Sequence, residues 1–151
     1  MFRATFGPDN TQADMDAYCA EAFGASQQER ELCDAARVCV MVERDNMLAA
    51  FAWLHIGATH ACIVGEHPVE IQRFYVDPRW HGRGMAQQLM SAALEEVLAR
   101  GGQTVWLGVW DRNARAIRFY EKQDFTDVGS HVFMLGHDAQ TDRILTKSVI
   151  R

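Results

Sequence analysis

Residues 75–87 read Tyr75-Val76-Asp77-Pro78-Arg79-Trp80-His81-Gly82-Arg83-Gly84-Met85-Ala86-Gln87, and this stretch decides the fold. A strand ends here, a short loop with two glycines follows, and a helix begins that we expect to span Gly84–Arg100. Glycine lets the backbone approach a ligand closely. The first N–H groups of a helix lack internal partners and lie at the positive end of its dipole, so such a terminus binds phosphate. The helix carries one apolar stripe, formed by Met85, Leu89, Met90, Ala93, Leu94, Val97 and Leu98, and Gly101-Gly102 end it.

Two familiar nucleotide-binding loops do not fit this stretch. It lacks the Gly-Lys-Ser/Thr of a P-loop, which disfavours a nucleoside triphosphatase. Gln87 stands where a dinucleotide-binding loop has its third glycine. A plain strand-to-helix turn without a ligand is the alternative that the loop alone leaves open.

The strand before the loop, Val69–Val76, changes its apolar pattern half way. Val69 and Ile71 are apolar on one face, whereas Phe74 and Val76 continue on the other. This switch indicates a β-bulge near Gln72-Arg73, and a strand buried on both faces is the alternative.

The order of the expected strands and helices on either side of this strand predicts one mixed sheet with helices on its faces. Thr11, three residues before Asp14, predicts a helix start, and a second short helix is expected over Gln27–Ala35. Asn113 is expected to cap a helix that ends at Asp124 and Phe125. The expected strands are 2–6, 38–42, 47–56, 69–76, 104–110, 126–135 and 143–149, with a turn at Asp45-Asn46 and a loop over 57–68.

Composition sets the protein class. The 151 residues include 48% hydrophobic side chains and carry a net charge of −5, which predicts one globular domain over residues 1–151. The acidic balance argues against a nucleic-acid partner. No apolar run reaches the roughly 18 residues of a membrane helix. Four cysteines without metal-binding spacing predict no metal and buried free thiols in a reducing cytoplasm; they are Cys19, Cys33, Cys39 and Cys62.

Three motifs together resemble the GNAT (GCN5-related) N-acetyltransferases, which use acetyl-CoA. Residues 81–86 are similar to their [Q/R]-x-x-G-x-[G/A] loop, residues 74–78 (FYVDP) to the strand end before it, and residues 113–125 (NARAIRFYEKQDF) to the N-x-x-A-x-x-x-Y-x-x-x-G-F segment. The resemblance covers 69–125 and implies an α/β (α+β) fold, with a mixed, mostly antiparallel sheet of about six to seven strands and about four helices. His81 departs from the family's Gln or Arg, and Asp124 from its glycine.

The resemblance implies roles for individual residues. It implies acetyl-CoA as cosubstrate, with Tyr120 near the sulfur as the acid and Glu70 as a water-mediated base. Packing is the alternative for Tyr120, and a solvated or salt-bridged carboxylate is the alternative for Glu70. Gln72 stands where polyamine-acetylating relatives carry a second acid. The implied cofactor-binding residues are Phe74, Tyr75, Val76, His81, Gly82, Arg83, Gly84, Met85, Ala86, Gln87, Asn113, Ala116 and Phe119.

Residues 105–125 and 129–142 also resemble bacterial spermidine/spermine acetyltransferases within this family, which implies a small polyamine as the acceptor. A peptide or protein N-terminus, an aminoglycoside, or a non-catalytic CoA sensor are the alternatives. Trp110 is expected beside the acceptor pocket and Trp106 in the core. Candidate cation contacts, most of them surface charges, are Asp111, Asp124, Asp127, Asp138 and Asp142. Loop or core histidines, not metal ligands, are His55, His60, His67, His131 and His137. A homodimer through residues 126–149 is a further expectation from the resemblance.

Overall fold

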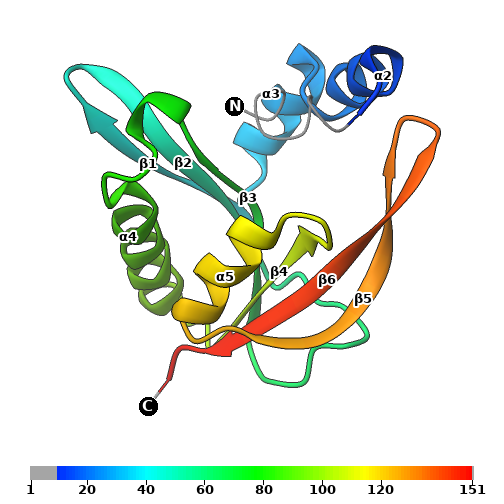
Figure 1. Cartoon of the computed structure of the whole chain (residues 1–151). Coiled ribbons are helices and arrows are strands. Elements are labelled where there is room, and N and C mark those ends of the chain that lie inside the picture. Colours follow the sequence, from blue (N-terminus) through cyan, green and yellow to red (C-terminus); the bar gives the residue numbers. More distant parts are fainter. Residues whose placement is uncertain (1–9, 151) are drawn as a thin grey trace.

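The computed structural model describes residues 10–150, which form one six-stranded sheet with helices packed on it (Figure 1). The strands are β1 (Arg37–Arg44), β2 (Met47–Ile56), β3 (Pro68–Val76), β4 (Thr104–Trp110), β5 (Thr126–Leu135) and β6 (Asp138–Ser148). The helices are α2 (Gln12–Ala22), α3 (Ala25–Cys33), α4 (Met85–Ala99) and α5 (Ala114–Lys122), with a 3-10 turn η2 (Pro78–Trp80). The order across the sheet is β1-β2-β3-β4-β6-β5, and only β3 and β4 run parallel. The predicted mixed, mostly antiparallel sheet is therefore confirmed, while the expected strand 2–6 lies outside the described residues.

The sheet opens between β3 and β4. These strands pair only from Pro68 with Thr104 to Glu70 with Trp106, although both continue beyond that point. The two halves of the sheet diverge toward the top of Figure 1. The backbone edges of β3 and β4 beyond Glu70 and Trp106 are thus left unpaired by the sheet.

A bulge lies next to this opening. Against β2, Arg73 is opposite Trp53 and Ile71 is opposite Leu54, so Gln72 is the extra residue. The predicted bulge is confirmed, and it explains the changed pattern, because Val69, Ile71 and Phe74 all pack into one core. Arg73 and Tyr75 consequently face the other side of the sheet.

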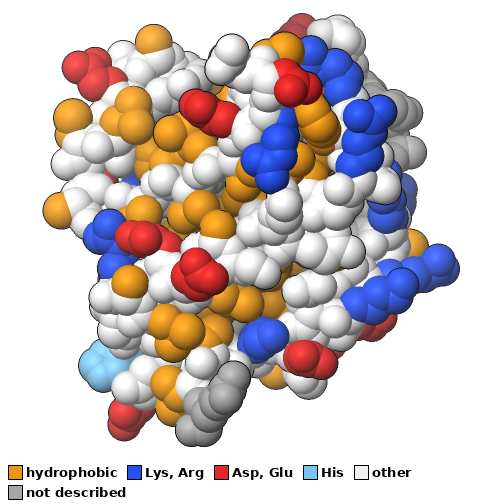
Figure 2. Space-filling view, turned by 90° about the vertical axis from the view of Figure 1, so that its left-hand side faces the viewer, with side chains coloured by type: hydrophobic (Ala, Val, Ile, Leu, Met, Phe, Trp, Pro, Cys, Tyr) orange, Lys and Arg blue, Asp and Glu red, His pale blue; other side chains and the backbone are white. Residues whose placement is uncertain are grey.

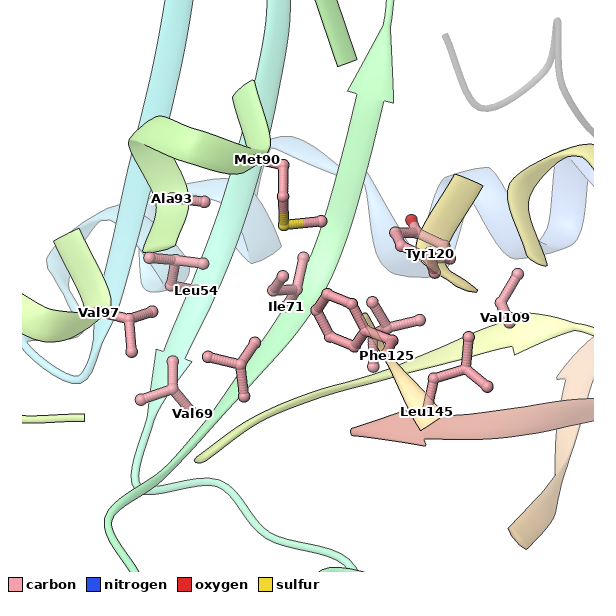
Figure 3. Close-up of a cluster of buried hydrophobic side chains, with 12 residues drawn as sticks. Leu54, Val69, Ile71, Met90, Ala93, Val97, Val109, Tyr120, Phe125 and Leu145 are labelled. Carbon is pink, nitrogen blue, oxygen red and sulfur yellow. The ribbon is translucent and has the colours of Figure 1, made fainter. Parts of the chain in front are cut away.

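The main core lies between the sheet and the helices α4 and α5 (Figure 3). Its buried members are Leu54, Val69, Ile71, Met90, Ala93, Val97, Val105, Leu107, Val109, Tyr120, Phe125 and Leu145. A smaller cluster on the opposite side joins Met15 of α2 to Leu135 of β5, with Tyr75 packed against them. We call these two sides of the sheet the α4–α5 face and the α2 face.

Most local predictions agree with the structure. Thr11 caps α2 by accepting a hydrogen bond from the Asp14 N–H at 3.2 Å. Asp45 and Asn46 form the β1–β2 turn with φ of 52° and 58°, the left-handed values that a tight hairpin requires. Gly84 and Asn113 are the N-caps of α4 and α5.

Three expectations need correction. β6 starts at Asp138 rather than at 143, because Gly136, at φ of 63°, allows a tight turn and pairing resumes at Leu135 with Asp138. α5 ends at Lys122, because Asp124 adopts a left-handed φ of 65° that a right-handed helix excludes. The cysteines are free but not buried: Cys33 ends α3 at the surface, and the others are half-buried.

The outer side near α4 and the β1–β2 hairpin is a mixed surface. In Figure 2, which views the molecule from that side, hydrophobic side chains lie between polar and charged ones. Large apolar residues exposed on these elements are Met41, Met47, Leu48 and Leu98. Within residues 10–150, no helix is both long and apolar enough to cross a membrane.

Candidate active site

A cavity of about 490 Å³ lies where β3 and β4 part. Its walls come from β3, β4, the loop between β3 and α4 (residues 77–84, called the glycine loop below), the first turns of α4 and α5, and single residues of α2 and β6. Phe74, Val76 and Tyr120 line it on the α4–α5 face, while Tyr75 and Tyr18 line it on the α2 face. The cavity therefore passes through the sheet and connects its two faces.

Local hydrogen bonds shape the glycine loop. The Asp77 carboxylate accepts from the Arg79 N–H at 2.9 Å and pairs with the Arg79 guanidinium at 2.8 Å, which closes η2. Gly82 and Gly84 then adopt φ of 73° and 76°. A Cβ built on either glycine meets nothing within 4 Å, so these positions need glycine for backbone conformation rather than for space.

The loop and the start of α4 present backbone donors to the cavity. Met85, Ala86 and Gln87 form the first turn of α4, whose N–H groups have no partner within the helix. They line the cavity together with Gly82 and Gly84. This donor set fits the phosphates of acetyl-CoA, since helix N-termini bind such groups.

His81, a departure from the family pattern, ties the loop to its surroundings. Its Nε2 lies 2.9 Å from the Val76 carbonyl oxygen, and its Nδ1 lies 3.3 Å from Arg115 of α5. The side chain therefore holds the loop against the end of β3. Arg83 instead lies over the Trp80 ring, at 5.5 Å, and does not line the cavity.

The other predicted cofactor contacts line the cavity. Asn113 caps α5 by accepting a hydrogen bond from the Ala116 N–H at 3.2 Å, and it also lines the cavity. The remaining predicted contacts with this placement are Phe74, Tyr75, Val76, Ala116 and Phe119. Because β3 has no strand beside it on its β4 side here, its backbone can pair with an extended ligand along that edge.

Tyr120 is held rigidly at the wall of the cavity. The ring packs edge-on against Phe119 and Phe125, with centroids at 5.4 and 5.8 Å. The residue is 7% exposed, and its oxygen points away from Phe125 and Leu145 (Figure 3). Burial raises the pKa of the phenol well above its usual value, so the hydroxyl keeps its proton at neutral pH.

Glu70 lies at the closed end of the opening, not in the cavity lining. It is the last β3 residue paired with β4, opposite Trp106. Burial raises the pKa of its carboxyl group, and the charge of Arg37 partly opposes this. Arg37 itself pairs with Asp34 at 3.2 Å and donates to Gln72. A raised pKa makes this carboxylate a stronger base, although Glu70 itself does not line the cavity.

The α2 face of the cavity contains residues from four elements. Tyr18 comes from α2, Arg73 from β3, Trp110 from β4 and Asp142 from β6. Trp110, which the sequence predicts beside an acceptor pocket, lines the cavity. Sequence reasoning missed Tyr18 and Arg73; a charged residue inside an apolar strand was the one available signal for Arg73.

Arg73 is anchored by α3. Its guanidinium pairs with both Glu31 oxygens, at 2.8 and 3.0 Å, and lies 4.6 Å from the centre of the Phe23 ring. Glu31 is 4% exposed. This buried pair fixes α3 against β3 directly beside the cavity.

Asp142 is the only carboxylate of the described residues that lines the cavity. Burial, helped by the negative charge of Asp111, raises the pKa of Asp142 to about 6. The other candidate acids are surface charges, as expected: Asp127 pairs with Arg143, Asp124 lies near Lys147, Asp138 accepts from Gln140, and Asp111 is exposed.

The tryptophan and histidine predictions can also be placed. Trp106 is 4% exposed and donates from Nε1 to the Ala58 carbonyl at 2.8 Å, which confirms it as a core residue. His60 and His131 stack near it, with their ring centroids 5.4 Å apart. His55 lies in β2, His67 in a loop and His137 in the β5–β6 turn. In the described part of the chain, no group of three or more His, Cys, Asp and Glu could hold a metal ion.

Comparisons with known proteins point to one family. A family model described as Acetyltransferase (GNAT) family matches residues 3–125. An uncharacterized N-acetyltransferase of Lactobacillus delbrueckii subsp. lactis is 30% identical over 149 residues, which are 99% of this chain and 86% of the relative.

Solved structures share the fold. The PaiA N-acetyltransferase of Thermoplasma acidophilum, in complex with coenzyme A, matches with a TM-score of 0.72 at 18% identity, over 97% of this chain and 85% of that one. The spermidine/spermine N-acetyltransferase SpeG of Vibrio cholerae has a TM-score of 0.66 at 19% identity, over 85% of this chain and 74% of that one. At these identities the likeness shows the fold alone.

Proposed function

The chain belongs to the acetyltransferase (GNAT) family of acetyl-CoA-dependent enzymes, and from this we propose that its acceptor is a primary amine of a small cation, with polyamines such as spermidine or spermine as the leading class. One observation supports this most: the cavity joins the glycine loop and Tyr120 on one face to a single carboxylate, Asp142, on the other. Acetyl-CoA and an amine that enter the cavity from opposite faces of the sheet would meet at the opening between β3 and β4.

The glycine loop and the first turn of α4 would hold the pyrophosphate of acetyl-CoA. The free edge of β3 beyond Glu70 would pair with the pantetheine arm, as an added strand does. The thioester would then lie at the gap, within reach of an amine from the α2 face.

In this proposal Tyr120 is the acid. An ordinary thiol has a pKa of about 8.5, and an ordinary phenol has one of about 10, which burial raises further here. Complete proton transfer from Tyr120 to the thiolate is therefore uphill. What the hydroxyl supplies is a hydrogen bond to the sulfur as its negative charge develops, donated from a ring already fixed in place.

Glu70 is the proposed base, acting through water. An alkyl ammonium must lose a proton before it attacks and a second one as the amide forms. The half-buried Glu70 carboxyl group, at the closed end of the gap, is placed to receive such a proton along a water chain. The overall reaction would convert an ammonium and acetyl-CoA into an amide, free CoA thiol and one proton.

The test is release of free thiol from acetyl-CoA with a panel of amines, with the product identified by mass spectrometry. The panel includes spermidine, spermine, an aminoglycoside, a peptide with a free N-terminus, and glutamate as an anionic amine. We expect turnover of the small cations and none of glutamate. Exclusive turnover of the peptide, or no turnover of any amine by protein that binds acetyl-CoA, would refute the proposed acceptor class.

A further inference from the structure

Asp142 occupies a central position on the acceptor side of the cavity. In the sheet it is opposite Trp110 of β4 on one side and His131 of β5 on the other. Leu107 and Val109 belong to the core of the α4–α5 face, so Gly108 between them faces the α2 side. A Cβ built on Gly108 would come within 3.1 Å of Asp142 Oδ2, which places this carboxylate directly over Gly108.

The absent side chain at Gly108 leaves space beside the carboxylate. Both Gly108 and Asp142 line the cavity, and a methyl group at Gly108 would crowd the carboxylate at 3.1 Å. Trp110 lines the same wall, and the Arg112 guanidinium, 5.9 Å from the centre of its ring, shows that this aromatic surface accommodates a cation.

The described arginines nearest Asp142 in the sheet pair with other carboxylates. Among residues 10–150, no hydrogen bond or ion pair links its carboxylate to another side chain. Arg73, on β3, is engaged by Glu31, and the neighbouring Arg143 pairs with Asp127 at 2.7 Å.

Arg112 lies over the Trp110 ring, with its guanidinium 5.9 Å from the ring centre, and among the described residues it forms no ion pair with Asp142. The other titratable neighbours are neutral or negative. Tyr18 of α2 is neutral, since burial raises the pKa of its phenol. Burial, together with His60, lowers the pKa of His131 on β5, so its ring is neutral near pH 7. Asp111, at the end of β4, adds a second negative charge.

Partial burial disfavours the ionised form of Asp142, and none of the described residues provides its carboxylate with a counter-ion. We propose that Asp142 binds an ammonium group of the acceptor on the α2 face, and that this contact selects cationic amines. The inference rests on the proposed function and adds to it the residue that recognises the acceptor. Asp142 is a specificity residue here, distinct from Tyr120 and Glu70.

This role has a consequence for pH. The ionised form of Asp142 binds the cation, and the pKa of the free carboxyl group is about 6. Amine binding should therefore strengthen as the pH rises through 6, and bound amine should lower the pKa of Asp142 in return, because the two binding events are linked.

The test compares Asp142→Asn with Asp124→Asn, which removes the same charge from a side chain that is 90% exposed and outside the cavity. For Asp142→Asn we expect the KM for spermidine to rise about 10- to 100-fold, the scale of a lost charge-assisted contact. The KM for acetyl-CoA should stay within two-fold, and the fall in amine affinity below pH 6 should disappear. Asp142→Glu should recover part of the loss.

Two results would overturn the inference: an unchanged KM for spermidine in Asp142→Asn at pH 8, or equal increases in both variants. Direct titration of spermidine into CoA-bound protein separates this inference from the proposed function. If the wild-type protein binds spermidine and Asp142→Asn does not, the site stands even without turnover. If turnover occurs but the two proteins bind spermidine equally, the site falls and the function stands.

Discussion

Replacing Tyr120 by phenylalanine separates packing from chemistry at this site. The ring is held by Phe74, Phe119 and Phe125, and phenylalanine keeps each of these contacts. The hydroxyl makes no hydrogen bond to another described residue, so its removal leaves no buried partner unsatisfied. We therefore expect the free energy of unfolding to change by less than about 1 kcal/mol.

The activity should change far more than the stability. A hydrogen bond to a charged group is worth about 1.5–3 kcal/mol, and Tyr120 would donate one only as the thiolate develops. Because 1.36 kcal/mol corresponds to a tenfold change in rate, kcat of Tyr120→Phe should fall by about 10- to 150-fold. In the wild-type protein the raised pKa of Tyr120 should keep the hydroxyl protonated, so its ionisation should not reduce kcat below about pH 10.

Thiol release at saturating acetyl-CoA and spermidine measures kcat, urea unfolding measures stability, and calorimetric titration measures the Kd of acetyl-CoA. A kcat within three-fold of wild type, with stability and Kd unchanged, would show that Tyr120 only packs. A parallel loss of stability or of acetyl-CoA binding would contradict the expectation that a phenylalanine ring keeps the packing contacts of Tyr120.

Four further changes test the fold and its charges. Glu31→Gln breaks the buried ion pair with Arg73 and should lower the free energy of unfolding, measured in urea, by about 3–5 kcal/mol. Glu29→Gln, on the exposed side of α3, should leave the stability unchanged. Equal effects of the two changes would contradict a stabilising role of the buried pair. Gly84→Ala, at φ of 76°, should cost about 1–2 kcal/mol and weaken acetyl-CoA binding in a calorimetric titration, and an unchanged Kd would separate the loop from the cofactor. Asp124→Gly, at φ of 65°, should raise the urea midpoint, because glycine adopts this conformation without steric cost. Asp142→Asn should stabilise the protein at pH 7 to 8 and have little effect below pH 4. The raised pKa of Asp142 means that the folded state disfavours the ionised carboxylate. This lowers the free energy of unfolding above pH 6, and the effect vanishes at low pH, where the carboxyl group is protonated in both the folded and the unfolded chain. A stability difference that does not depend on pH would refute the last prediction.

Features that arise from neighbouring residues could be predicted before the fold was known. The left-handed turn at Asp45-Asn46, the cap at Asn113 and the bulge at Gln72 follow from short-range backbone preferences, and each is present. The glycine loop and the resemblance it supports predicted many of the residues that line the cavity, because these residues belong to a few contiguous segments. Where local signals were weak, as at the start of β6, the predicted boundary was wrong by several residues.

Only the tertiary structure decided which side chains meet across the opening. Tyr18, Arg73 and Asp142 come from α2, β3 and β6, and they share a wall because the bulge turns Arg73 to the α2 face, α2 docks on β5, and the β4–β6 pairing sets Asp142 over Gly108. The same geometry leaves Glu70 at the closed end of the gap and outside the cavity lining. A one-residue shift in any of these pairings would turn the side chains to the other face. Local patterns specify the backbone of each segment, whereas the α2 face of the cavity depends on strand register and helix docking between segments far apart in the chain.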